Sequence, residues 1–142
     1  MSTLDKFHGN LRIIRLCMLM AVAVYFVIIT QFPAPRHLTG LGRIELGVVL
    51  LTLWGVNSVF VLNRKYVRDS ETLLKNQPED LKAARRWQAG YIMIYAFEFL
   101  VCMWGTALHF FGSPVTHVVP FFAASALFIA WFRPGIQSEA ME

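Results

Sequence analysis

The stretch "YIMIYAFEFLVCMWGTALHFF", residues 91–111, is the most informative part of the sequence. It is long enough to cross a bilayer, because a spanning helix needs ~20 mostly apolar residues to match a hydrocarbon core of ~30 Å. Glu98 lies near its middle, where a lone carboxylate in hydrocarbon is energetically costly and by default marks a site. The stretch therefore predicts a transmembrane helix that carries a polar site.

Three further apolar stretches, residues 16–32, 46–62 and 117–132, complete the pattern. The chain of 142 residues is 56% hydrophobic and only 15% charged. Soluble domains contain ~45–50% apolar and ~25% charged residues. We therefore predict an all-α, polytopic integral membrane protein, with residues 1–142 forming a single domain of four transmembrane helices.

The basic residues predict the orientation of these helices. Of thirteen Lys and Arg residues, all except Arg36 and Arg43 lie before the first span, between the second and third spans, or after the fourth. Four spans place these three segments on one side, which the positive-inside rule assigns to the cytoplasm. We expect an inner (cytoplasmic) membrane with both termini cytoplasmic. The net charge of +4 then reflects topology and lipid headgroups rather than nucleic acid.

The connection between the second and third spans, residues 63–88, has the pattern of a cytoplasmic helical hairpin. "RKYVRDSETLLK" continues the second helix, "NQPED" breaks it, and Pro78 suits the first position of the next helix. At 1.5 Å per residue the hairpin would stand ~15–20 Å above the membrane. We expect Arg85, Arg86 and Trp87 at the headgroup level, where they form a candidate docking site for a partner.

Glu98 is the leading candidate for an intramembrane polar site. Counted from Trp87 at the interface, it lies ~16 Å deep, near the middle of the bilayer. Either a protonated Glu98 hydrogen-bonds to Asn57 or Ser58 on the second helix, or these residues handle a proton or ion. A contact with a partner subunit or a cofactor is a further possibility. We predict that Glu98 points toward other helices, because its helical face carries the less bulky residues Tyr91, Ile94, Cys102, Gly105 and His109.

Polar side chains also gather at the predicted outer ends of the spans. His37, His109, His117 and Glu45 include enough imidazole and carboxylate groups to bind zinc or copper. None of their spacings is a metal-binding motif, however, and Glu45 can equally pair with Arg43 or cap the second helix. The sequence therefore assigns no metal and no cofactor, and leaves these histidines as weak candidates.

Three short motifs of the third span and its hairpin occur in the same order in a known family. Gln77-Pro78-Glu79 lies in the predicted turn, Glu98 lies in the span, and Trp104-Gly105 follows it. With these motifs, residues 63–112 resemble the proteolipid (c) subunit of rotary ATP synthases, a two-helix hairpin with an intramembrane carboxylate. Asn76 stands in place of that family's loop arginine. The resemblance covers about a third of the chain and implies, for Glu98 alone, a site that binds and releases a proton.

The sequence contains no pattern typical of an enzyme. It has no nucleophile elbow, no phosphate-binding loop, no HExxH motif and no paired carboxylates at catalytic spacing. We predict a small non-catalytic subunit of a larger membrane protein complex that contacts the lipid bilayer and other subunits or copies of itself. The alternatives are a proton- or ion-translocating, proteolipid-like carrier that uses Glu98, and a membrane metal-binding protein or enzyme that uses the outer histidines.

Overall fold

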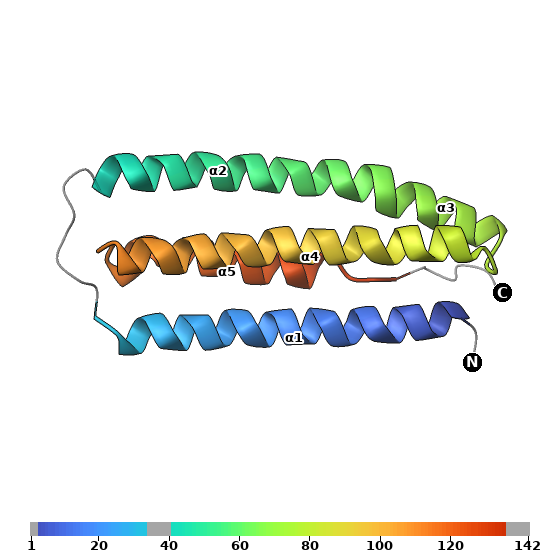
Figure 1. Ribbon diagram of the computed structural model, residues 1–142, viewed down its shortest axis with the longest axis horizontal. Helices are drawn as coiled ribbons and strands as arrows, with labels where there is room; N and C mark the ends of the chain where they lie inside the picture. The colour runs from blue at the N-terminus through green and yellow to red at the C-terminus, as the bar shows by residue number, and fades with distance from the viewer. Residues whose placement is uncertain (1–2, 34–40, 136–142) are drawn as a thin grey trace.

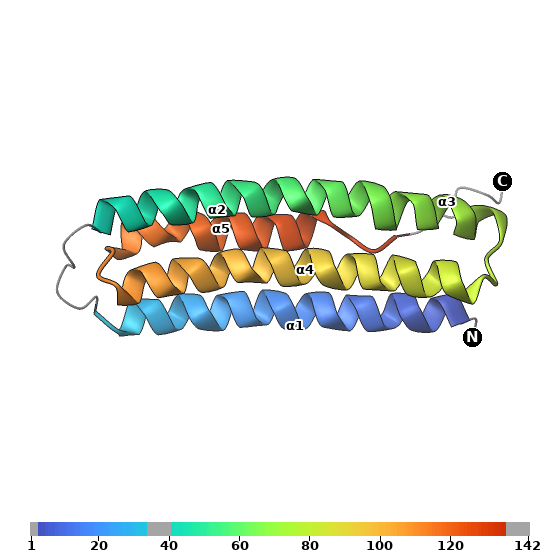
Figure 2. The ribbon, with the colours of Figure 1, turned by 45° about the horizontal axis from the view of Figure 1, so that its top comes forward.

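The computed structural model describes residues 3–33 and 41–135, which form helices and no strand. The described part folds into four helical rods that lie side by side, each antiparallel to the rod before it in the chain (Figures 1 and 2). The second rod is continuous through a π-helical segment, η1, that joins α2 to α3. The all-α prediction is confirmed for the described residues. The elements are α1 (Thr3–Gln31), α2 (Leu41–Leu62), η1 (Asn63–Arg68), α3 (Asp69–Asn76), α4 (Leu81–Phe110) and α5 (Val115–Trp131).

Three of the rods are long and apolar enough to cross a membrane. They comprise Leu4–Gln31, Leu41–Asn76 and Leu81–Phe110, with mean hydropathies of 2.5, 1.8 and 1.6 over their most apolar windows. The fourth, α5, is apolar but shorter, with 17 residues. Each rod contains one of the four apolar stretches that the sequence predicts. The first three rods also extend well beyond those stretches.

Helix α4 lies at the centre of the bundle and packs against every other described element. Half of its most apolar window is buried, compared with 11% for the windows of α1 and of the α2–α3 rod. The face of α4 that we predicted to point toward other helices is indeed buried, including Glu98. The core of the bundle is therefore organised around α4, whereas α1 and α2 expose much of their apolar surface.

Helix α5 packs closely against α4 at Gly105. A Cβ atom at this position would lie 2.8 Å from Cβ of Phe121 and 3.2 Å from Cε2 of Phe122. The backbones can approach this closely only because glycine has no side chain. Gly105 therefore fixes how deeply the aromatic face of α5 enters the core.

Helix α2 stands apart from α1 and α5. Its backbone approaches only α4 and η1 among the described elements, and its buried residues are Gly55 and Val59. An apolar groove of about 310 Å³ remains between α2 and α5, lined by residues that include Leu53 and Phe121. The outer face of α2 is thus not covered by the described part of this chain.

The turn between α3 and α4 differs from its predicted geometry. Helix α4 begins at Leu81, three residues after Pro78, and Asp80 is its N-cap. The Asp80 carboxylate accepts hydrogen bonds from the backbone N–H groups of Lys82 and Ala83, at 2.9 and 3.2 Å. The prediction that Pro78 opens the helix is therefore wrong, because Asp80 satisfies the otherwise free N–H groups of the first turn.

The bundle extends past the end of α5 as a three-helix segment, which we call the projection. It comprises residues 3–14 of α1 and residues 65–90, from η1 to the first turns of α4. The sequence predicted only a two-helix hairpin here. The N-terminal part of α1 supplies the third helix. Helix α1 begins at Thr3, so it extends thirteen residues before the apolar stretch that starts at residue 16. The projection has a core of its own, formed by Leu11, Val67, Leu74, Ala83, Ala84 and Trp87.

Gly105→Ala tests the close contact between α4 and α5. We expect this change to lower the free energy of unfolding by ~1–3 kcal/mol, because overpacking forces neighbouring side chains to shift. Gly47→Ala is the control, since a Cβ atom there meets nothing within 4 Å. Unfolding in detergent micelles, followed by circular dichroism, measures both variants. Equal stability of the two variants would contradict the close contact.

Candidate functional site

Glu98 lies near the middle of α4, within the core of the bundle, and is 1% exposed. Neither of its carboxylate oxygens has a hydrogen-bond partner among the described residues. Its backbone carbonyl, in contrast, accepts a hydrogen bond of 2.6 Å from the hydroxyl of Ser125 on α5. The structure thus joins α4 to α5 at Glu98 through the backbone and leaves the carboxyl group itself without a partner.

Asn57 and Ser58 do not bond to Glu98, although they were its expected partners on the second helix. The Asn57 side chain is exposed, and the Ser58 hydroxyl donates to the carbonyl of Trp54, one turn earlier on α2, at 2.9 Å. Helix α2 turns Gly55 and Val59 toward α4. Asn57 is two residues from each, which places it about 200° around the helix at 3.6 residues per turn. It therefore lies on the outer face.

The carbonyl groups at the end of α5 are hydrogen-bonded by side chains from α1 and α4. Arg15 on α1 donates from Nε to the carbonyl of Ile129 and from an Nη atom to that of Ala130, both at 3.1 Å. The hydroxyl of Tyr95 on α4 donates to the carbonyl of Phe132 at 2.7 Å. A cationic side chain at a helix C-terminus also interacts favourably with the helix dipole. These bonds satisfy carbonyl groups at the end of α5 that have no partner within the helix, so α5 can end inside the bundle.

Glu71 on α3 continues this polar cluster into the projection. The hydroxyl of Tyr91 lies 3.0 Å from the carbonyl oxygen of Arg133 and 3.4 Å from Oε1 of Glu71. The same carboxylate oxygen accepts a hydrogen bond of 3.2 Å from Nε1 of Trp87. Glu71 therefore links α3 to α4 through two aromatic side chains that each present a polar atom.

Trp87 does not lie where the sequence predicted. It is fully buried, and its ring stacks on that of His8 with the centroids 6.3 Å apart. The expectation that Trp87 faces headgroups or a partner is wrong, because α1 extends along the projection and covers it. Arg85 and Arg86 are exposed as expected. Arg86 also donates to the carbonyl of Lys65 at 3.3 Å.

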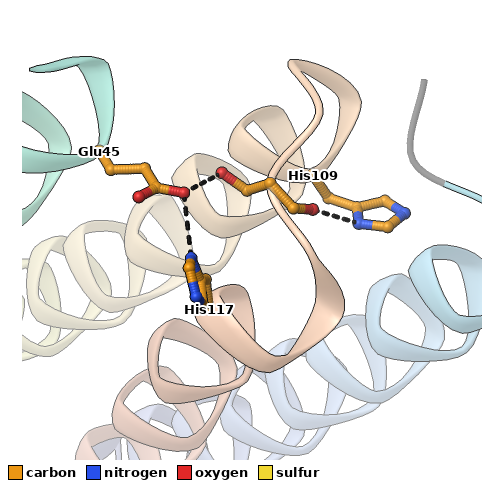
Figure 3. A network of polar contacts seen from close by, with 4 residues as sticks. Glu45, His109 and His117 are labelled. Carbon is orange, nitrogen blue, oxygen red and sulfur yellow. Dashed lines mark hydrogen bonds and ion pairs between the residues drawn. The ribbon is translucent and has the colours of Figure 1, made fainter. Parts of the chain in front are cut away.

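The opposite end of the bundle holds a second polar network (Figure 3). The Glu45 carboxylate of α2 accepts a hydrogen bond of 2.5 Å from the hydroxyl of Ser113, and Nδ1 of His117 lies 3.3 Å from the same oxygen. His109 lies between two backbone carbonyl oxygens, with Nε2 2.7 Å from that of Phe32 and Nδ1 3.1 Å from that of Ser113. The network fastens the ends of α1, α2 and α4 to the start of α5.

The turn between α4 and α5 places Ser113 at the centre of this network. Gly112 has a φ of 109°, in the left-handed region that glycine adopts without strain. The N–H of Ser113 bonds to the carbonyl of Leu108 at 3.0 Å, which closes the end of α4 in the manner of a Schellman motif. The sequence "GSP" shows a turn at this position, but it does not reveal that Ser113 joins Glu45 to His109.

The outer histidines do not form a metal centre in the described structure. Both ring nitrogens of His109 are directed at carbonyl oxygens, and His117 contacts only Glu45 among the described metal-ligating side chains. Residues 3–33 and 41–135 contain no group of three His, Cys, Asp or Glu residues that could hold a metal ion. His37, the third histidine of the predicted set, lies outside the described residues.

Comparison with protein families, with curated proteins and with solved structures finds no match for this chain. Its function must therefore be argued from its own geometry. The described polar side chains differ in their partners. Glu45 bonds to Ser113 and His117, and Glu71 bonds to Trp87 and Tyr91. Arg15, Tyr95, Ser125 and His109 pair with backbone carbonyl groups, whereas the side chains of Glu98 and Asn57 have no hydrogen-bond partner in the described part of the chain.

Arg15→Gln tests whether the end of α5 depends on its cationic cap. We expect a loss of ~1–3 kcal/mol in the free energy of unfolding, because two buried carbonyl groups lose a charged donor. Arg12→Gln is the matched control: it removes the same charge from the same helix, at an exposed position. Unfolding in mixed micelles, followed by circular dichroism, gives both values. Equal losses in the two variants would contradict the capping role.

Proposed function

We propose that this chain is a four-span protein of an inner (cytoplasmic) membrane. The length and composition of α1, α2 and α4 support this placement, and the exposed apolar faces of α1 and α2 suit contact with lipid. On α2, Arg43 and Arg64 are 21 residues apart, or ~31 Å at 1.5 Å per residue. This separation matches a hydrocarbon core of ~30 Å with one basic residue at each surface.

The distribution of charge supports a cytoplasmic position for the projection. The start of α1, the turn between α3 and α4, and the end of α5 point toward the same end of the bundle (Figure 1). Eleven of the thirteen Lys and Arg residues lie near this end, within residues 6–15, within residues 64–86, or at Arg133. The positive-inside rule places such segments in the cytoplasm. From Arg64 to Asn76 the helix then extends ~18 Å beyond the hydrocarbon core.

Within this placement, the function that we infer is that of a small non-catalytic subunit of a larger membrane complex. The observation that carries this proposal is the projection, which is a folded three-helix segment with apolar side chains on its surface. Leu73 is 49% and Leu81 is 51% exposed, and Arg85 and Arg86 are exposed on the next turn of α4. Exposed apolar groups beside charges are typical of a protein-binding surface. An acidic partner subunit would suit it.

The use of the buried polar groups supports a non-catalytic role. Arg15, Tyr95, Thr106 and Ser125 all donate to backbone carbonyl oxygens. Such contacts hold helices together, and a donor that is engaged by the backbone is not directed at a substrate.

The double variant Arg85→Glu/Arg86→Glu tests the docking role of the projection. We expect it to lose its partner subunits, because it reverses charge beside the exposed leucines. Lys6→Glu/Arg12→Glu is the control, with the same charge change at exposed positions on the α1 helix of the projection, so the pair tests whether docking uses the surface of α4 around Arg85 and Arg86. The measurement is purification of tagged protein from its native membrane in mild detergent, followed by native mass spectrometry. Wild-type protein that purifies without any other subunit would overturn the proposal.

A second candidate function is proton binding at Glu98. It is favoured by the buried carboxyl group, whose two oxygens have no partner in the described part of the chain. The resemblance of residues 63–112 to rotary proteolipid subunits supports the same role. In this alternative the chain is a proton- or ion-translocating carrier, and Glu98 is the group that gains and loses the proton.

Glu98→Gln separates the two candidate functions. If Glu98 carries protons, we expect the variant to abolish proton flux into vesicles that contain the purified protein, because an amide cannot exchange the proton. Glu79→Gln, at an exposed position in the α3–α4 turn, is the control. A pH-sensitive dye inside the vesicles reports the flux under an imposed membrane potential. Undiminished flux in Glu98→Gln would rule out the hypothesis that the chain is a proton carrier. If the chain is an accessory subunit, we expect this variant to assemble normally with its partner subunits.

A further inference from the structure

The outer face of α2 carries a regular apolar stripe, which we call the α2 seam. Its members follow one another at intervals of four, three, four and three residues, the heptad spacing by which helices pair in coiled coils. The four apolar members are 61%, 58%, 61% and 51% exposed, in chain order, and the polar member is also exposed. The seam consists of Leu46, Leu50, Leu53, Asn57 and Phe60.

The described part of the chain does not cover this seam. Helix α2 rests on α4 through its opposite face, and its backbone does not come close to α1 or α5. Phe60 makes edge contacts with the rings of Phe128 and Phe132, with centroids 6.2 and 6.0 Å apart, and still remains half exposed. Leu53 also lines the groove between α2 and α5. The seam therefore borders α5 at Leu53 and Phe60, and each of its residues remains exposed.

Asn57 distinguishes the seam from an ordinary lipid-facing surface. At 1.5 Å per residue it lies ~10 Å from Arg64 and ~21 Å from Arg43, so it would be inside the hydrocarbon core. Its amide has two donors and one carbonyl acceptor, and no hydrogen bond to it occurs among the described residues. Acyl chains have no group that can bond to it. An unpaired amide in hydrocarbon is costly, so a protein partner is favoured at this position.

We propose that the α2 seam pairs with the α2 seam of a second copy of this chain, as a parallel dimer. Two copies inserted in the same direction carry Asn57 at the same depth, because Arg43 and Arg64 hold each copy at the same level. An asparagine amide is both donor and acceptor, so it is complementary to itself. A twofold axis along the membrane normal brings each seam residue opposite its own counterpart. The helices cross at ~20°, as heptad packing requires.

A different helix or a lipid would satisfy the seam less well. A foreign helix would need both the heptad spacing and a polar side chain at the depth of Asn57, whereas a second copy supplies both. A single asparagine in a heptad seam also fixes the register and the number of helices that associate. The inference rests on the membrane placement proposed above, but it does not require the projection to dock a partner.

Disulfide cross-linking in a membrane tests the proposal. The background is Cys17→Ala/Cys102→Ala, which removes both native cysteines. One variant adds Leu53→Cys, in the seam, and the matched control adds Leu51→Cys, which is 50% exposed on the same helix but outside the seam. The proteins are reconstituted into phosphatidylcholine/phosphatidylglycerol vesicles at high lipid excess and oxidised with copper phenanthroline. We expect Leu53→Cys to form covalent dimers and Leu51→Cys to form several-fold fewer.

Asn57→Val supplies the second measurement. Added to the Leu53→Cys protein, it should weaken dimer formation by roughly 3- to 30-fold, the range expected for one hydrogen-bonding side chain between membrane helices. Leu50→Cys, also in the seam and 58% exposed, replaces Leu53→Cys if that variant does not fold. Equal cross-linking at the seam and control positions, or no effect of Asn57→Val, would overturn the proposal.

Native mass spectrometry distinguishes this inference from the accessory role. Complexes that contain other subunits but show no seam-specific cross-link would leave the accessory role intact and reject the dimer. Dimers of this chain that purify without any other subunit would support the dimer and reject the accessory role.

Discussion

The fold depends on how the carbonyl groups at its helix ends are hydrogen-bonded. The last carbonyl groups of an α-helix have no partner within the helix, and an apolar bundle offers no water to replace one. At the end of α5 the donors are Arg15 and Tyr95. At the other end of the bundle, His109 lies against carbonyl oxygens of Phe32 and Ser113. Several buried or half-buried polar side chains thus hydrogen-bond to backbone carbonyl groups.

This constraint explains why α4 is the central helix. Tyr91 and Tyr95 bond to carbonyl groups just after the end of α5, and His109 bonds to a carbonyl group just after the end of α1. One helix therefore holds the ends of two of its neighbours. Gly105 lets α5 pack closely between these levels. Because its positions are fixed at three levels, α4 has little freedom to rotate, and Glu98 is held toward the core. An unpaired carboxyl group is thereby kept in a place from which it cannot turn away.

The sequence predicted what depends on apolar length and helical period, and missed what depends on contacts between distant segments. The four apolar stretches and the buried face around Glu98 follow from composition and spacing. Trp87 was misplaced because its burial requires the start of α1, eighty residues earlier in the chain, to lie against it. The contact of Ser113 with Glu45 is equally non-local. Asn57 was paired with Glu98 because sequence gives its depth but not its direction around α2.

Glu98 and Asn57 both lack a hydrogen-bond partner in the described part of the chain, with different physical consequences. Glu98 is enclosed by the helices of its own chain. The surroundings of its carboxyl group are therefore set by this bundle and do not depend on a partner subunit. Asn57 faces outward on α2, and no residue in the described part of the chain bonds to it. Because α2 rests on α4 through the opposite face, pairing at Asn57 does not need to disturb the surroundings of Glu98. The proposed pairing through α2 and the proposed proton binding at Glu98 would therefore be separable properties of the same small fold.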